Sequence, residues 1–277
     1  IWLDERWGFL LSGAHLKVWN ASIPIFRECI TRKCIDSWHK LQATRRPFPQ
    51  DPLLWEEIDE ELVEHNRIFG FIDCHMCYTC KPGTGPVENG PDAPRRENAY
   101  MIQRSFYTGY IRKHGLKYES LSLPNGMCAF LEGPHSIRNA DSDVTIAGGI
   151  NRHLEIAQTD NDFYSCAYGD GAYYDRTCLA GKFRPPCSTR QLAYNKAFKA
   201  MRVTVENDFC TTANLFPYTQ IWRKQHLFGS GNQLSHLLYK IATLMKNAHI
   251  CVKHCQTSTY YDCPPPRLQE YFVDMAE

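Results

Sequence analysis

The sequence has no run of about eighteen consecutive apolar residues, so no part of it is long enough to cross a membrane as a helix. Its first eleven residues lack the basic-then-apolar layout of a signal peptide, and Ile1 is not a start residue, so we expect a fragment or a trimmed product. Internal repeats and low-complexity segments are also missing. The 277 residues are 43% hydrophobic, which excludes a disordered chain and predicts one large domain or a domain with a helical appendage.

A complete set of disulfides is excluded as well, because the thirteen cysteines are odd in number. Cys74, Cys77 and Cys80 form a Cys-x-x-Cys-x-x-Cys run that suggests zinc, but a closed zinc site needs four ligands, and His75 adjoins Cys74 instead of completing a second spaced pair. In a strand, the three-residue spacing places Cys74 and Cys80 on one face and Cys77 on the other. We therefore favour buried reduced thiols over a metal site, which fits a reducing cytosol or nucleus.

The formal net charge is only +1, yet charge is unevenly distributed along the chain. Residues 51–64 contain seven acidic residues and no basic one, whereas residues 176–253 contain twelve Lys or Arg and two acids. The second segment predicts a basic surface for a polyanion such as DNA, with a merely solvated face as the alternative.

The pattern of residues divides the chain into a helical, Trp-rich segment over 1–66 and an α/β domain over 67–277. Strands interleaved with helices predict an α/β sheet with its site at one edge. We expect strands over 68–73, 116–123, 127–131 and 163–168, and 116–123 alternates like a half-buried strand. We also expect a turn over 124–126, a loop over 81–98, and helices over 141–157, 192–215 and 234–248. The helix over 192–215 carries an apolar stripe that faces the core.

Four carboxylates occupy positions that suit a hard-metal site. Asp73 and Asp170 each follow an expected strand, Asp141 follows Gly133-Pro134, and Glu206 lies on an expected helix, thirty-six residues after Asp170. Oxygen ligands of this kind select Mg²⁺ or Mn²⁺, with water and substrate phosphate completing the coordination. Taken singly, an Asp at a strand end is more often a turn or a helix cap, but four together indicate phosphodiester chemistry.

Several motifs, in the same order, resemble those of Harbinger-type DDE transposases and their domesticated nuclease relatives. They cover residues 65–272 approximately, and each alone is weak. The matching segments are Phe69-Gly-Phe-Ile-Asp73, Lys113-His-Gly-Leu-Lys-Tyr-Glu-Ser120 with Leu123-Pro-Asn-Gly126, Gly133-Pro134 with Asp141, Tyr168-Gly-Asp-Gly-Ala-Tyr173, and Tyr194-Asn-Lys196 with Arg202-Val-Thr-Val-Glu206.

This resemblance implies an RNase H-like mixed sheet flanked by helices, and a divalent-metal DNA endonuclease or transposase core. Asp73, Asp170 and Glu206 would be the catalytic DDE triad, and Asp141 an additional metal ligand. Two Mg²⁺ or Mn²⁺ ions would serve as cofactors. The resemblance also implies DNA as substrate, a Myb-like DNA-binding partner protein and a nuclear location; a homo-oligomer stays open.

The chain departs from the family pattern beside three of the acids. Cys74 replaces a glycine after the first Asp, Ala140 replaces a histidine, and Asn207-Asp-Phe-Cys210 replaces Trp-x-Phe-Gly. The Pro-rich loop over 83–103 also looks longer than in the family.

Five basic residues are candidate contacts of DNA phosphate. Arg202 precedes Glu206 by one helical turn and can orient that carboxylate or contact phosphate, with an ordinary surface pairing as an equal alternative. Lys113 and His114 are expected near the first acid, and Lys196 and Lys199 lie on the helix that leads to Arg202. The alternative function is a catalytically silent protein that binds DNA or chromatin with the same fold; a zinc-binding module at Cys74–Cys80 is the third hypothesis.

Overall fold

The computed structural model describes residues 22–36, 68–82, 96–156, 165–173, 178–220 and 235–272. The acidic run over 51–64 lies outside the described residues. So do all five Trp residues of the N-terminal segment, Trp38 included. Residues 22–36 form a helix, as predicted for this part of the chain.

A six-stranded mixed sheet forms the centre of the molecule. Its strands are β1 (Ile68–Thr79), β2 (Tyr107–Thr108), β3 (Lys113–Ser122), β4 (Cys128–Ser136), β5 (Cys166–Tyr168) and β6 (Leu179–Ala180). Strand β3 pairs antiparallel with β1 on one side and with β4 and β2 on the other. On the far side of β1 the sheet continues with β5 and then β6, both parallel. The prediction of a mixed sheet flanked by helices is confirmed.

Two expectations about the strands were wrong. Strand β1 does not end at Asp73 but continues to Thr79, because β3 supplies an antiparallel partner along its whole second half. Strand β3 does not alternate between buried and exposed residues. Its polar residues Lys117 and Glu119 are buried because helices cover both faces of the sheet at this point.

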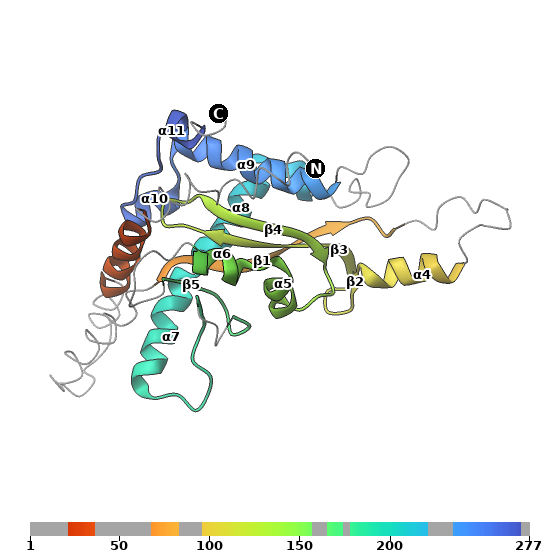
Figure 1. The fold of residues 1–277 in the computed structure, drawn as a ribbon, viewed down its shortest axis with the longest axis horizontal. Coiled ribbons are helices and arrows are strands. Elements are labelled where there is room, and N and C mark those ends of the chain that lie inside the picture. Colours follow the sequence, from red (N-terminus) through yellow and green to blue (C-terminus); the bar gives the residue numbers. More distant parts are fainter. Residues whose placement is uncertain are drawn as a thin grey trace.

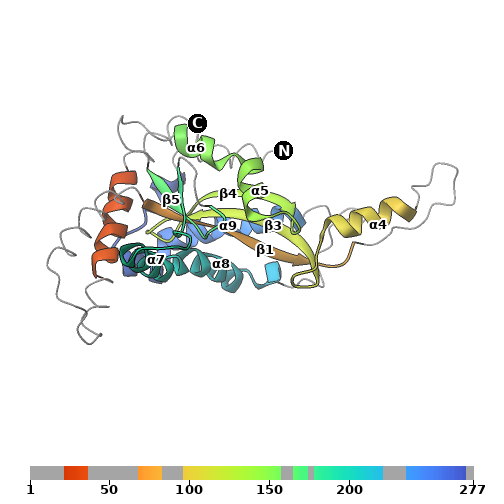
Figure 2. The same cartoon turned by 90° about the horizontal axis from the view of Figure 1, so that it is seen from below.

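Helices lie on both faces of the sheet (Figures 1 and 2). They are α4 (Arg96–Ser105), α5 (Asp141–Gly148), α6 (Ile150–Ile156), α7 (Thr189–Met201), α8 (Val203–Leu215), the 3₁₀ turn η1 (Pro217–Gln220), α9 (Ser235–Lys253), α10 (Gln256–Tyr261) and α11 (Leu268–Phe272). Helix α5 packs on β3 and β4 from one face, and α8 and α9 pack on β1, β3 and β4 from the other. Helix α4 projects away from the sheet in both views.

Local sequence explains where several helices begin and end. Helix α7 begins with a capping box, in which Ser188 and Gln191 each bond the other's backbone N–H. The helix expected over 141–157 breaks at Gly149, whose φ of 66° is left-handed. The helix expected over 192–215 is two helices, α7 and α8, which meet at Arg202. The loop expected over 81–98 ends earlier, since α4 begins at Arg96.

One hydrophobic core joins the N-terminal helix, the parallel strands and α7–α8. Buried residues of helix 22–36, such as Phe26 and Ile30, belong to the same cluster as Phe71 of β1 and Tyr261 of α10. The predicted stripe on α7 and α8 also packs into it, with Val205 wholly buried. The division of the chain at residue 66 stays a prediction. Within the described part of the chain, no helix is both long and apolar enough to cross a membrane.

Candidate active site

Asp73 lies in the middle of β1, at the point where that strand loses its parallel neighbour. The last registered pair of β1 and β5 joins Phe71 to Tyr168, while β1 continues beside β3 alone. The side chain of Asp73 is 19% exposed. Its carboxylate accepts the backbone N–H of Cys74 at 2.8 Å through Oδ1, which fixes its orientation. The carboxyl ends of parallel strands are where α/β sheets place their ligand sites.

Asp170 lies two residues after the end of β5 at Tyr168. Because Phe71 pairs with Tyr168, Asp73 and Asp170 each lie two residues beyond a paired position, on strands about 4.8 Å apart. The Asp170 carboxylate accepts the backbone N–H of Ala172 at 2.7 Å, a turn that holds it beside the strand end. The charge of Asp170 also raises the pKa of Asp73. The structure therefore brings the first two predicted acids together.

Glu206 reaches the same place from the facing helix α8, through Arg202. The guanidinium of Arg202 donates from Nη1 to Asp73 Oδ2 and from Nη2 to Glu206 Oε1, both at 2.6 Å. The pairing of Arg202 with Glu206 is expected both for an orienting residue and for an ordinary surface ion pair, and a contact of Arg202 with phosphate stays a prediction. The bond from Arg202 to Asp73 was not predicted, because it joins residues 129 positions apart in the sequence.

The pKa of Asp73 is raised to about 6. Burial is the main cause, and the neighbouring charges of Asp170 and Asp141 add to it. The backbone N–H of Cys74 and the guanidinium of Arg202 act in the opposite direction but do not cancel the effect. The Asp73 carboxylate thus carries a negative charge that its protein partners compensate only in part.

Asp141 lies on the other face of the sheet and has its own cationic partner. The Lys117 ammonium donates to Asp141 Oδ1 at 2.7 Å and to the backbone carbonyl of Asn139 at 2.6 Å. Lys117 pairs with Met76 on β1, and it points to the α5 face, away from Arg202. A role of Asp141 as a metal ligand stays a prediction.

Cys74 also points to the α5 face, because successive residues of a strand alternate. Its thiol accepts a hydrogen bond from the Tyr173 hydroxyl at 3.4 Å, and burial raises its pKa. Cys77 lies on the opposite face, as the strand spacing predicts, and packs near Leu116 and Tyr239. None of the thirteen cysteines forms a disulfide, and Cys74, Cys77 and Cys80 are half-buried, not fully buried as expected.

Next to Asp73 on the α8 face, His75 is packed between two aromatic rings. Its ring centroid lies 4.7 Å from that of Phe209 and 5.0 Å from that of Tyr239. Burial lowers the pKa of His75 to about 4, so the imidazole is neutral at pH 7. The shifts of His75 and Asp73 have opposite effects on stability: falling pH disfavours the folded state through His75 and favours it through Asp73.

The predicted phosphate contacts do not all lie near the site. His114 pairs with Thr79, six residues along β1 from Asp73, so it and Lys113 lie about 20 Å away at ~3.3 Å per residue. Their expected position near the first acid was therefore wrong. The Lys113 ammonium instead lies over the Tyr78 ring, 4.3 Å from its centroid.

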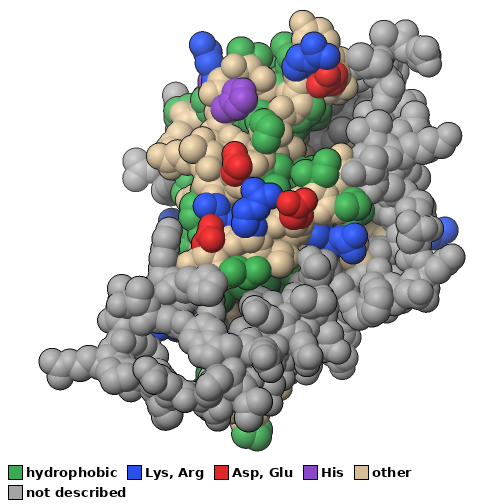
Figure 3. Space-filling view, turned by 90° about the vertical axis from the view of Figure 1, so that its left-hand side faces the viewer, with side chains coloured by type: hydrophobic (Ala, Val, Ile, Leu, Met, Phe, Trp, Pro, Cys, Tyr) green, Lys and Arg blue, Asp and Glu red, His purple; other side chains and the backbone are tan. Residues whose placement is uncertain are grey.

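Lys196 and Lys199 are exposed on α7, about two turns and one turn before Arg202, respectively. The surface is less basic than the sequence suggested, because Lys240 and Lys246 are buried. On the face shown in Figure 3, described side chains of both signs lie side by side.

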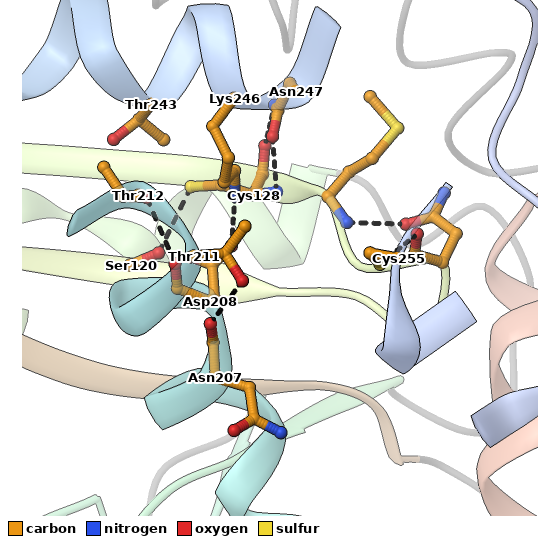
Figure 4. A network of polar contacts seen from close by, with 12 residues as sticks. Ser120, Cys128, Asn207, Asp208, Thr211, Thr212, Thr243, Lys246, Asn247 and Cys255 are labelled. Carbon is orange, nitrogen blue, oxygen red and sulfur yellow. Dashed lines mark hydrogen bonds and ion pairs between the residues drawn. The ribbon is translucent and has the colours of Figure 1, made fainter. Parts of the chain in front are cut away.

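A buried ion pair joins α8, the helix of Glu206, to α9 (Figure 4). Lys246 of α9 donates to Asp208 of α8, and their side chains are 0% and 4% exposed. Asn247 adjoins this pair and exchanges two hydrogen bonds with the backbone of Cys128 on β4. The sequence reasoning missed this network; a Lys within the apolar run of α9 was the available signal.

The donor chemistry of the acidic cluster suits a divalent cation. Asp73, Asp170 and Glu206 offer hard oxygen ligands, and Asp73 retains uncompensated charge. Among the described residues, no three His, Cys, Asp or Glu side chains converge closely enough to hold a metal ion, since Arg202 stands between Asp73 and Glu206. The three acids fit such an ion in type and charge, but the guanidinium of Arg202 lies between Asp73 and Glu206.

Comparison with known families identifies the class of protein. A family model described as DDE superfamily endonuclease matches residues 92–253, which is more than half of the 277 residues. The chain therefore belongs to the DDE superfamily endonuclease family. The match includes Asp170 and Glu206 and begins after β1, so it does not include Asp73. No curated protein and no solved structure matches the chain.

Proposed function

We propose that this chain is the catalytic core of a Harbinger-type DNA endonuclease or transposase that depends on divalent metal ions. The observation that carries the proposal is the alignment of Asp73 and Asp170 on neighbouring parallel strands, with Glu206 tied to Asp73 through one side chain. Membership of the DDE superfamily endonuclease family supports it.

The sheet supports an RNase H-like assignment. Strands β1, β3 and β4 form an antiparallel unit, and β5 and β6 extend it in parallel beyond β1. The proposed triad uses the central strand, the end of its parallel neighbour and the helix that covers them.

In the proposed reaction, Asp73, Asp170 and Glu206 would hold the divalent ions at the scissile phosphodiester. Two bound Mg²⁺ or Mn²⁺ ions would supply activation of the attacking water or 3′-hydroxyl and stabilisation of the leaving oxygen. Lys196 and Lys199 bind DNA phosphates along α7 without reading bases. A Myb-like partner protein would supply sequence specificity, and the site of action would be the nucleus.

A second candidate function is a catalytically silent protein that binds DNA or chromatin. The Arg202 bridge favours it, because two of the three carboxylates already have a cationic partner. Both functions use the same fold, so only chemistry distinguishes them.

A plasmid nicking and strand-transfer assay with Mg²⁺ or Mn²⁺ tests the proposal. Cleavage by the wild type that Asp170→Asn and Glu206→Gln both lose, while their circular dichroism is unchanged, would establish the enzyme. Asp143→Asn is the matched control, because Asp143 is an exposed carboxylate on α5 with no place in the cluster. A wild type that binds DNA and never cuts, across both metals and varied DNA ends, would favour the silent binding protein.

A further inference from the structure

We infer that Arg202 is a built-in counter-cation, which bridges Asp73 and Glu206 and which a divalent ion must displace to reach them. This inference rests on the proposed function, since it concerns how the same carboxylates take up their cofactor. It assigns to Arg202 a role that neither the resemblance nor the family match gives it.

The bridge uses the geometry that is particular to arginine. Nη1 and Nη2 point along the two arms of one planar fork, and each meets a different carboxylate oxygen at 2.6 Å. Both are short, charge-assisted hydrogen bonds, which are stronger than hydrogen bonds between neutral groups. A lysine in this place has a single point of positive charge and cannot span both acids in the same way.

The backbone of Arg202 is fixed, so displacement requires only its side chain to move. Arg202 ends α7 and precedes α8, and its N–H donates to the Phe198 carbonyl at 2.8 Å. The residue before it, Met201, is 1% exposed, and Val205 on α8 is wholly buried. The side chain itself is 25% exposed, and Glu206 is 49% exposed, so solvent reaches the bridge.

Charge makes the guanidinium and a divalent ion competitors for this place. A metal ion between Asp73 and Glu206 would meet the positive charge of Arg202 at contact distance, where repulsion is largest. The bridge also occupies one oxygen of each acid. Metal binding must therefore overcome the loss of both ion pairs of Arg202, and this lowers the apparent affinity of the protein for the metal ion.

Titration of the DNA-free protein with Mn²⁺, followed by electron paramagnetic resonance and calorimetry, tests the inference without using activity. We expect Arg202→Met to bind Mn²⁺ about tenfold more tightly than the wild type, because two charge-assisted bonds no longer compete. We expect Arg202→Lys to fall between them. Arg202→Met should also lose thermal stability without metal and gain more of it on adding Mn²⁺.

Lys253→Met is the charge-matched control, since it removes one positive charge from an exposed position at the end of α9 that has no place in the cluster. Its Mn²⁺ affinity should stay within about twofold of the wild type, as expected for a screened surface charge. If Arg202→Met binds Mn²⁺ no more tightly than Lys253→Met, or more weakly than the wild type, the inference is wrong. Should Arg202→Met not fold, the Arg202→Lys affinity decides the question in the same way.

Failure of the proposed function gives a different result. In that case neither the wild type nor the Arg202 variants would bind Mn²⁺ stoichiometrically, and Asp73→Asn would change nothing. Binding by the wild type that Asp73→Asn abolishes, together with no gain in Arg202→Met, would overturn the inference alone.

Discussion

Replacing Lys246 by Met should strongly destabilise the protein, because the change leaves a buried carboxylate without its counter-ion. Lys246 is wholly buried on α9, and its ammonium donates a hydrogen bond to Asp208 of α8. Met keeps most of the aliphatic length of Lys, so little packing is lost. The effect measured is therefore mainly electrostatic.

The expected loss is about 3–5 kcal/mol in the free energy of unfolding, the usual cost of removing one partner from a buried ion pair. That is a large fraction of the roughly 5–15 kcal/mol that stabilises a typical domain. Removing both charges, in Asp208→Leu with Lys246→Met, should recover most of the loss, since an apolar pair of similar volume needs no desolvation.

Urea unfolding at pH 7, followed by circular dichroism, measures both variants. Lys253→Met is the control, because Lys253 is exposed near the end of the same helix and should change stability by less than about 0.5 kcal/mol. A loss below about 1 kcal/mol for Lys246→Met would refute the reasoning. A double variant as unstable as the single one would show that packing, not charge, matters at this position.

Three further predictions concern other parts of the fold. The pKa of His75 falls from 6.5 to about 4 on folding. Lowering the pH from 7 to 4 should therefore reduce the free energy of unfolding, measured in urea, by about 3 kcal/mol more in the wild type than in His75→Phe. Equal reductions in the two proteins would contradict this. Gly126→Ala should lower stability by about 2 kcal/mol or more, because Gly126 has a φ of 83° and an added Cβ would overlap the Cys255 sulfur; an unchanged melting temperature would count against it. Asp141→Asn should lower the free energy of unfolding by about 1–3 kcal/mol, since it leaves the buried Lys117 ammonium without its carboxylate. An unfolding curve identical to that of the wild type would contradict this.

The sequence predicted the strands and helices where residue patterns act locally. The hairpin between β3 and β4 follows from Pro124-Asn-Gly126, and the apolar stripe on α7 and α8 predicts their burial. The end of β1 could not be predicted, because its extension beyond Asp73 depends on pairing with β3 some forty residues later. The burial of Lys117 depends likewise on α5, which covers the face that alternation assigned to solvent.

The candidate site was predictable in its residue types but not in its contacts. The positions of Asp73, Asp170 and Glu206 came from motifs and strand ends. In the structure Asp170 follows the strand that pairs with the strand of Asp73, and Arg202 links Asp73 to Glu206. Arg202 was expected beside Glu206 because an interval of four residues is local on a helix. Its second partner and the pairing of Asp141 are tertiary contacts, which spacing along the chain does not encode.

The most direct test of the central claim is single-turnover cleavage of a short DNA duplex in Mn²⁺, measured together with DNA affinity on the same preparations. We predict that the wild type cuts, and that Asp73→Asn, Asp170→Asn and Glu206→Gln each bind the duplex but lose cleavage. Cleavage that persists in Asp170→Asn would contradict it, and so would a folded wild type that binds DNA and Mn²⁺ without cutting.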